Sequence, residues 1–432
     1  MFSRRDIQKS VEQLATVLSK KQLVLLVQKL NSSSFEQVSA EWEVVVLAAI
    51  SRIALLKHEH DSGGSSRPDV RATVCDLGLE FVADVCAVSD ATMEDENPVD
   101  FFRDEMFAVA RELGIAGAGL FLHVEPLEKT EPKQRRLLAL PPKGEIQRFI
   151  RVHVRPFLQQ LAAEPALDRV LEHSEDTVAL KVRYDASERR ISGGGWPNYT
   201  WPRTSRHNPM YRILQQKSDQ LRASGFDGLK GVIVCDAGCE TLGSRSESIT
   251  NGFFAQHRKT VSFVATLKIP DANTSVGGRP RLETKWDLFW NPHHEVTDRP
   301  LVEETFARVV ALLPPALRAS QYARNRSFAP DLRYHQSFEG AYMIDGSGSR
   351  ERIRVSARAV LQTLAGNLRF RESWGYSIPV QVFQAQINEG RMIKSVQLER
   401  SEHDDDDWLV IEFDDPDPAV SPYRVPDECA QV

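Results

Sequence analysis

The sequence predicts an α/β protein of more than one domain, and three patterns support this fold class. Apolar residues recur at helical spacing near the N-terminus, at Ile7, Val11, Leu14 and Leu18. Between residues 70 and 87, apolar and polar residues alternate as they do in a half-buried β-hairpin. Helical and strand patterns then follow one another along the chain, and its 432 residues are enough for two or three domains.

The composition is that of an ordinary globular protein, with 41% hydrophobic and 26% charged residues. No apolar run approaches the length of a membrane span, and the first residues lack the apolar segment of a secretory signal. Five scattered cysteines are too few for a disulfide framework, so we expect a soluble protein of the reducing cytoplasm. A net charge of −6 still permits nucleic-acid binding, because a local basic groove is sufficient for that.

The helical spacing continues from residue 5 to residue 30, and a second helix, apolar almost all round, is predicted over about 35–57. Asn-Pro pairs at 97–98 and 208–209 predict two further helix starts, with Asn as the cap and Pro in the first turn. A helix over 144–162 is expected to be interrupted near its proline.

Composition also suggests where the domains divide. A Pro- and Arg-rich stretch between 315 and 332 predicts a boundary. We therefore expect an N-terminal helical segment (1–34), a main domain (35–328) and a C-terminal α/β accessory domain (329–432). The segments FEGAYMI, YSIPVQVFQAQI and DDWLVIEF are predicted to be strands of that last domain.

Two aspartates on the predicted hairpin are candidate metal ligands. A turn near 77–78 places Asp84 opposite Arg71 and Cys86 opposite Asp69, so that the two aspartates form a diagonal pair on one face, roughly 7–8 Å apart at the backbone. Two like charges beside an apolar hairpin are stable only with a partner, and Mg²⁺ or Mn²⁺ is a hard cation that prefers oxygen ligands. The alternative is that Asp69 caps a turn while Asp84 pairs with Arg71.

These residues also carry a resemblance. Glu43 lies in the helical segment EWEVVVL, Pro68-Asp69 precedes the first hairpin strand, and Asp84 lies in FVADVCAV. This order resembles the PD-(D/E)XK, or restriction-endonuclease-like, nuclease superfamily, in particular an uncharacterised bacterial branch. The later segments MYRILQQKSDQL, GVIVCDAG and NPHHEVTDRPL extend the resemblance, which covers roughly residues 36–315.

The resemblance implies a restriction-endonuclease-like αβββαβ core with helical insertions, N-terminal helices and a small C-terminal α/β module. It implies a metal-dependent nuclease that hydrolyses phosphodiester bonds, with Asp69, Asp84 and Glu43 as ligands of Mg²⁺ or Mn²⁺; Glu41 is a rival of Glu43. DNA is favoured over RNA as the substrate, and anti-phage defence or restriction is the implied setting. A partner protein of a defence system and a homo-oligomer both remain open.

The chain departs from the superfamily pattern at one important position. The expected acidic-x-Lys sequence reads Asp84-Val85-Cys86, and a thiol cannot replace the lysine cation. Lys217 is the candidate replacement, because it falls on an apolar helical stripe where a charged residue is unusual. The alternatives are that Lys217 extends along the edge of the core towards solvent, and that the chain is an inactive scaffold that binds nucleic acid or protein.

Basic residues supply candidate nucleic-acid contacts. Arg148 and Arg151 form a stripe with Arg155 at helical spacing, and Arg203 and Arg206 follow a Gly- and Pro-rich loop. That loop contains three aromatic residues, Trp196, Tyr199 and Trp201. Cations interleaved with aromatic rings suit phosphate contact and base stacking. The alternative is a solvated helix face beside an anchored loop.

Overall fold

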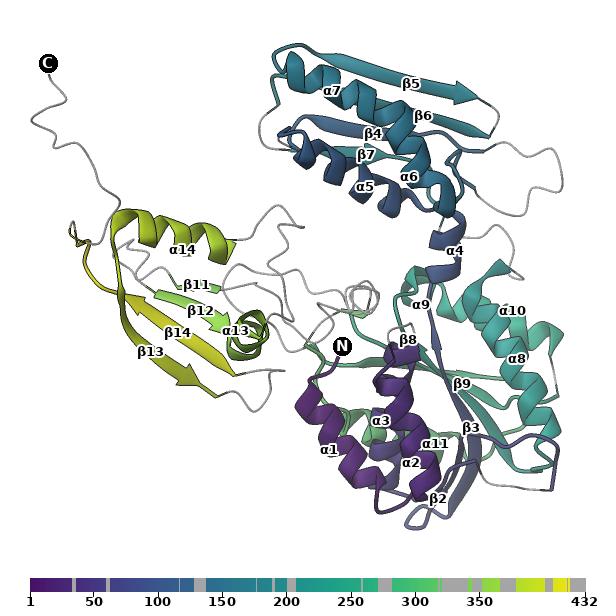
Figure 1. The fold of residues 1–432 in the computed structure, drawn as a ribbon. Coiled ribbons are helices and arrows are strands. Elements are labelled where there is room, and N and C mark those ends of the chain that lie inside the picture. The colour runs from purple at the N-terminus through teal and green to yellow at the C-terminus, as the bar shows by residue number, and fades with distance from the viewer. Residues whose placement is uncertain are drawn as a thin grey trace, which may run out of the picture.

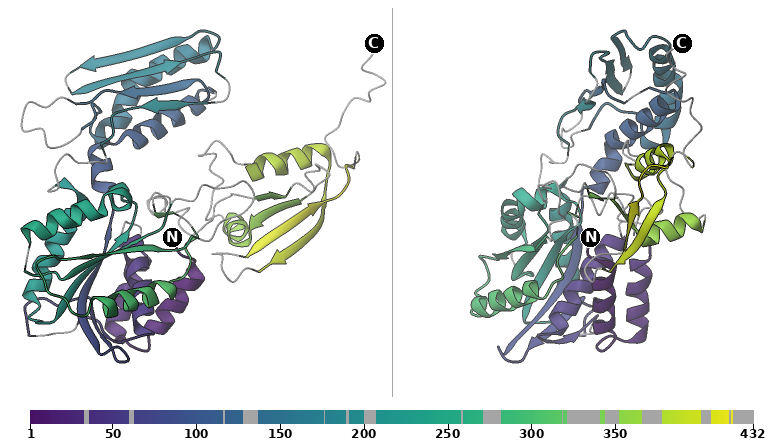
Figure 2. Two further views of the ribbon diagram at one scale, coloured as in Figure 1. Left: turned by 180° about the vertical axis from the view of Figure 1, so that it is seen from behind. Right: turned by 90° about the vertical axis from the view of Figure 1, so that its left-hand side faces the viewer.

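The structure is a computed structural model. It describes residues 1–32, 36–59, 63–115, 117–127, 137–175, 177–188, 191–199, 207–257, 259–270, 282–317, 319–320, 341–343, 352–365, 378–400, 407–417 and 419. Figures 1 and 2 show a central α/β unit, a second sheet-containing unit inserted into it and a smaller C-terminal unit. No helix in the described ranges is both long enough and apolar enough to cross a membrane.

A six-stranded mixed sheet forms the centre of the first unit. Its strands are β1 (Leu55–Lys57), β2 (Val70–Val74), β3 (Leu79–Val88), β8 (Leu229–Asp236), β9 (Phe263–Lys268) and β10 (Lys285–Trp290). Their order across the sheet is β1-β2-β3-β8-β9-β10. The first three strands are antiparallel, β3, β8 and β9 are parallel, and β10 is antiparallel to β9.

Helices cover both faces of this sheet (Figure 1). One face packs against α1 (Arg4–Leu14), α2 (Lys20–Leu30), α3 (Glu36–Ser51) and α11 (Arg299–Ala311). The other packs against α8 (Pro209–Ala223), α9 (Glu240–Ser244) and α10 (Ser246–Gln256). Strand β3 is buried on both faces, which explains its nearly continuous apolar sequence.

The N-terminal helices differ in two ways from the sequence prediction. The run from 5 to 30 is broken into α1 and α2 because Ser19 and Gln22 form a capping box that starts a new helix. The second predicted helix, α3, ends at Ser51 and not near residue 57. The last three residues of the predicted helix are strand β1, because Leu56 pairs with Ala72 across the sheet and this pairing outweighs local helix propensity.

The two Asn-Pro pairs have different roles. Asn208 caps α8 as predicted, accepting hydrogen bonds from the backbone N–H groups of Met210 and Tyr211. Asn97 does not cap the helix that follows it. Its side chain instead donates to the Met93 carbonyl and accepts from the Leu138 backbone N–H, which ties α4 (Ala91–Glu96) to the segment around Leu138.

The hairpin of β2 and β3 has a register that differs by two residues from the predicted one. Val70 lies opposite Ala83 and Arg71 opposite Val82, and Arg71 forms an ion pair with Glu80 at 2.8 Å. The predicted pairing of Arg71 with Asp84 is therefore wrong. A shift of two residues leaves every side chain on the same face, which is why alternation alone could not detect it.

An insertion between β3 and α8 has its own sheet and its own core. Its helices are α4 (Ala91–Glu96), α5 (Val99–Glu112), η1 (Lys143–Glu145), α6 (Ile146–Phe149), the π-helix η2 (Ile150–Val154) and α7 (Arg155–Ala163). Its strands are β5 (Arg169–Glu175), β6 (Val178–Tyr184), β4 (Leu120–Val124) and β7 (Gly193–Gly195), in that order across the sheet. The insertion is thus α/β and not helical as expected.

The helix predicted over 144–162 consists of successive helical elements (η1, α6, the π-helix η2 and α7), so the backbone remains helical while its hydrogen-bond pattern changes. The irregular part is the π-helix, whereas Pro156 lies in the first turn of α7. Pro156 closely follows the π-helix, so the change of hydrogen-bond pattern occurs where the proline lacks a backbone N–H.

The C-terminal unit contains a four-stranded sheet in the order β11-β12-β14-β13. Its elements are β11 (Ala341–Met343), β12 (Arg352–Ser356), α13 (Ala357–Leu364), α14 (Ile378–Glu389), β13 (Ile393–Glu399) and β14 (Trp408–Phe413). The described part of the segment YSIPVQVFQAQI, which was predicted to be a strand, lies in α14. Packing decides this, because Phe383 of the helix meets Phe413 of the sheet with ring centroids 5.8 Å apart. Most of the predicted boundary at 315–332 lies outside the described residues.

Candidate functional site

Asp69 and Asp84 are held together by the backbone around them. The Asp69 backbone N–H donates to Oδ1 of Asp84 at 3.0 Å, and the Val85 backbone N–H donates to Oδ2 of Asp69 at 2.9 Å. The corrected register places the two residues directly across the hairpin and not diagonally. Each carboxylate therefore has a fixed position at the edge where β2 begins.

Lys217 of α8 extends to both carboxylates. Its Nζ lies 3.6 Å from Oδ2 of Asp69 and 4.0 Å from Oδ2 of Asp84, and its side chain is 15% exposed. Burial alone would lower the pKa of this lysine, but the two aspartates outweigh it and raise the pKa. Lys217 is consequently a charged ammonium, and the alternative of a lysine that extends to solvent is wrong.

Asp84 is unusually destabilised in its charged form. The residue is 1% exposed, and its Oδ2 has no hydrogen-bond partner within the described part of the chain. Burial raises the pKa of Asp84 to about 6; the neighbouring Asp69 adds to this rise and Lys217 opposes it. A buried carboxylate oxygen that lacks a donor is costly, so this oxygen is suited to a further cation.

Glu43 approaches the pair from the opposite helical layer, on α3. Burial raises the pKa of Glu43; an ion pair with Lys29 at 3.2 Å opposes this rise, and the charge of Asp69 contributes to it. Its rival Glu41 accepts a hydrogen bond from the Phe2 backbone N–H at 3.3 Å and so serves the packing of the N-terminal segment. Of the two glutamates, Glu43 is the one whose charge acts on Asp69.

His58 also contacts the site, and the sequence analysis did not single it out. Its Nδ1 lies 2.6 Å from the Asp69 carbonyl oxygen, and because a carbonyl only accepts, Nδ1 carries the hydrogen. The Gln22 side chain donates to the His58 carbonyl at 2.9 Å and fixes the backbone there. No sequence pattern distinguishes this histidine, which follows a three-residue strand and precedes a loop.

Cys86 shares the face of Asp84, as the alternation of β3 requires. It is buried, and its thiol donates to the Ile233 carbonyl at 3.6 Å. Burial raises the pKa of the thiol to about 12, although Lys217 partly counteracts this. The group is therefore a neutral thiol, and the cation of the site comes from Lys217.

The donor chemistry of the pair fits a hard divalent cation. Mg²⁺ is commonly held by one or two carboxylates, with water and substrate phosphate as its remaining ligands. Asp69 and Asp84 supply two carboxylates, and Asp84 has an oxygen without a donor. Among the described residues, no group of three or more His, Cys, Asp and Glu side chains is arranged to hold a metal, so Glu43 is not positioned as a third direct ligand.

The candidate nucleic-acid contacts belong to the inserted unit or lie outside the described residues. Arg148 and Arg151 are exposed, on α6 and on the π-helix respectively. Arg155, which completes the predicted stripe, pairs with Glu112 at 2.8 Å. Tyr199 is buried in the core of the insertion and cannot stack on a base, and Trp201, Arg203 and Arg206 lie outside the described ranges.

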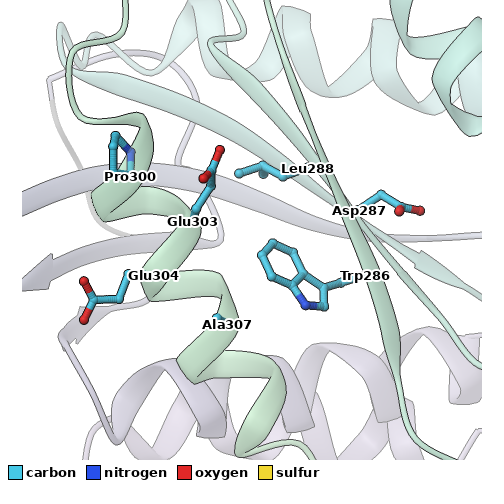
Figure 3. A pocket seen from close by; sticks show the side chains of 7 residues that line it. All are labelled: Trp286, Asp287, Leu288, Pro300, Glu303, Glu304 and Ala307. Atoms are coloured by element: carbon cyan, nitrogen blue, oxygen red, sulfur yellow. The ribbon is translucent and has the colours of Figure 1, made fainter.

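A cavity of about 560 Å³ lies at the far edge of the sheet, between β10 and α11 (Figure 3). Its carboxylates already have partners. Asp287 pairs with Lys268 at 2.6 Å, Glu304 pairs with Arg308, and Glu303 accepts a hydrogen bond from the Trp290 indole. The acidic residues of this cavity thus have partners of their own.

Comparison with known proteins yields no relative of this chain. No protein-family model matches it, and neither the curated proteins nor the solved structures contain a match.

Proposed function

We propose that this protein is a metal-dependent nuclease that hydrolyses phosphodiester bonds, with DNA favoured over RNA. The observation that carries the proposal is the convergence of Asp69, Asp84 and Lys217 on one point. The residues come from a hairpin and a helix more than a hundred residues apart, and with a divalent cation on the two carboxylates they would balance the charge of a scissile phosphate.

The order of elements supports the same proposal. Helix α3, strands β1, β2 and β3, helix α8 and strand β8 follow one another along the chain, interrupted by one insertion. Their four strands are neighbours in one sheet, with β8 parallel to β3. This succession corresponds to the αβββαβ core that the resemblance to restriction-endonuclease-like nucleases implies.

The roles of the side chains follow from their contacts. Asp69 and Asp84 would hold Mg²⁺ or Mn²⁺, which when bound supplies an activated water and neutralises charge on the phosphate. Lys217 would stabilise the additional negative charge that develops on the phosphate during attack. His58 orients Asp69 through its backbone carbonyl, and Glu43 contributes negative charge beside Asp69.

A second candidate function is a catalytically inactive scaffold of the same fold that binds nucleic acid or a partner protein. Cys86 favours it, because the neutral thiol occupies the position where the resembling nucleases have a lysine. A role in defence against phage, a partner protein from such a system, a cytoplasmic location and RNA as substrate remain further proposals that derive from the resemblance and the composition.

A cleavage assay separates the two functions. The active nuclease should degrade or nick DNA with Mg²⁺ or Mn²⁺ and stop when EDTA is added. Asp69→Ala and Asp84→Ala should abolish cleavage without loss of helical circular dichroism, whereas Asp219→Ala, an exposed aspartate on α8, should have no effect. Cleavage that persists in both site variants would reject this site, and DNA binding without any cleavage would favour the scaffold.

A further inference from the structure

A second cavity adjoins the candidate site. It has a volume of about 310 Å³ and lies between α2, α3 and the residues that follow β1. Glu43 and His58 line it; the charge of Glu43 interacts with that of Asp69, and His58 contacts the Asp69 backbone carbonyl. Asp69, Asp84 and Lys217 do not line this cavity, but the contact of His58 with the Asp69 carbonyl at 2.6 Å places the cavity next to Asp69.

The walls of the cavity combine an apolar surface with carboxylates. Leu25 is 47% exposed and lies on the wall beside the buried Leu26, so apolar surface is available for a flat ligand to contact. Glu36, Glu43 and Glu59 provide three carboxylates against the single ammonium of Lys29, which pairs with Glu43. This charge repels a phosphate and favours a group that donates hydrogen bonds, whether that group is neutral or cationic.

A nucleobase with an exocyclic amino group meets these requirements. Its face can stack on Leu25, and its amino group can donate to a carboxylate, as cytosine does to Glu or Asp in protein–DNA contacts. The cavity is at the small end of the range for ligand pockets, so it has room for a base but not for a base pair. A base that enters it must be unpaired, either in a single strand or flipped out of a duplex.

We propose that this cavity, lined by Leu25, Glu43, His58 and Glu59, binds an unpaired adenine, cytosine or guanine next to the phosphodiester at Asp69 and Asp84. The proposal rests on the proposed nuclease function and gives that site a substrate class: single-stranded or locally opened nucleic acid with amino-bearing bases. Thymine and uracil, which have no exocyclic amino group, are disfavoured.

Binding measurements with the full chain test the proposal independently of cleavage. Labelled decanucleotides of dA, dC and dT are titrated with protein at one salt concentration, with Ca²⁺ in place of Mg²⁺, and fluorescence anisotropy is recorded. The dA and dC oligomers should bind about tenfold more tightly than the dT oligomer. Glu59→Gln should reduce this preference.

Two neighbouring residues of α2 provide a matched pair of variants. Leu25→Ala should weaken binding of the dA and dC oligomers at least about threefold, because it removes apolar contact with the base. Val24→Ala, at a residue that is 46% exposed but does not line the cavity, should leave binding unchanged. Thermal denaturation should show the same midpoint for both variants.

The possible outcomes distinguish the cavity from the nuclease. Base preference without any cleavage in Mg²⁺ would reject the nuclease and retain the base-binding cavity. The proposal for the cavity would be overturned if the protein cleaves DNA but binds the three oligomers equally, and if Leu25→Ala and Glu59→Gln leave that affinity unchanged. The proposal would also be overturned if the protein shows no preference among the oligonucleotides but binds an oligo-arginine peptide, and if the two variants weaken that peptide binding. The cavity would then be assigned to a basic protein partner.

Discussion

Asp69 and Asp84 are joined by a hydrogen bond of 3.0 Å from the backbone N–H of the first to the carboxylate of the second, and Lys217 lies within 4.0 Å of both side chains. The backbone bond fixes the two carboxylates side by side without neutralising either of them. One ammonium has to balance two negative charges, of which the Asp84 charge is almost fully buried.

Asp84→Asn should stabilise the metal-free protein. The pKa of Asp84 is raised from 3.8 to about 6, so folding disfavours the charged form, and the cost is fully present above pH 6 and absent below about pH 4. The free energy of unfolding should accordingly fall as the pH rises from 4 to 6. Near pH 8 the variant should be more stable by roughly 1–3 kcal/mol, since one pKa unit corresponds to about 1.4 kcal/mol.

Urea denaturation in EDTA at a series of pH values measures this effect. The variant should lose the decline in stability between pH 4 and 6 that the parent protein shows. Asp100→Asn, at an exposed residue in an ion pair with Arg103, serves as the control for a change of charge. If Asp84→Asn is less stable than the parent protein at pH 8, the interaction of the Asp84 charge with Lys217 stabilises the fold by more than burial of that charge destabilises it.

Lys217→Met should lower cleavage by a factor of about 10²–10³, comparable with the removal of one group that stabilises transition-state charge. The substitution retains most of the volume of the side chain and removes the ammonium. Affinity for Mn²⁺, measured by calorimetry, should change little because lysine is not a ligand. Arg222→Met, at an exposed position near the end of α8, is the matched control. Unaltered turnover in Lys217→Met would remove this lysine from the mechanism.

His58→Ala should weaken Mn²⁺ binding about tenfold, because residues that orient a metal ligand contribute about 10- to 100-fold in affinity. His58→Asn should recover part of the loss, since an asparagine amide can also donate to the Asp69 carbonyl. His123→Ala replaces a half-exposed histidine of the inserted unit and should leave the affinity as it was. Equal losses in His58→Ala and His58→Asn would show that the imidazole acts by packing alone.

The sequence contained enough information to bring Asp69, Asp84 and Lys217 together. Alternation with a period of two assigned both aspartates to one face of the hairpin. The predicted register was wrong by two residues, but a shift of two residues leaves every side chain on the same face, so the assignment was still correct. Lys217 was identifiable because a charged residue on an apolar stripe requires a partner. What the sequence could not supply was the backbone hydrogen bond between the two aspartates, which depends on the true register.

Other features were beyond prediction because tertiary contacts decide them. His58 belongs to no motif, and only the pairing of β1 with β2 brings it to the Asp69 carbonyl. Strand β5 of the insertion was not predicted, since it is largely exposed and lacks a clear apolar face. Helix α14 has the β-branched residues of a strand, and the packing of Phe383 against Phe413 determines its conformation.

Cys86→Lys in a Lys217→Met background should restore cleavage to within about tenfold of the parent protein. Cys86 lies on the same face of β3 as Asp84, and its protonated thiol makes one weak hydrogen bond, to the Ile233 carbonyl. Lys217→Met removes the ammonium beside the two carboxylates, so the introduced lysine meets a negative potential that no other cation of the site balances. The new cation would then stand at the position that nucleases of the acidic-x-Lys pattern use.

The matched control is Cys86→Met in the same Lys217→Met background, which adds a side chain of similar length without charge. Steric disturbance of the core would affect both double variants, whereas electrostatic rescue would appear only with the lysine. Initial rates on a supercoiled plasmid with Mg²⁺, at pH values from 6 to 9, provide the measurement. Recovery with lysine alone would establish that one cation beside Asp69 and Asp84 is required and that either strand β3 or helix α8 can supply it. Equal inactivity of both variants, in proteins that retain Mn²⁺ affinity and their melting temperature, would show that the cation must approach from α8.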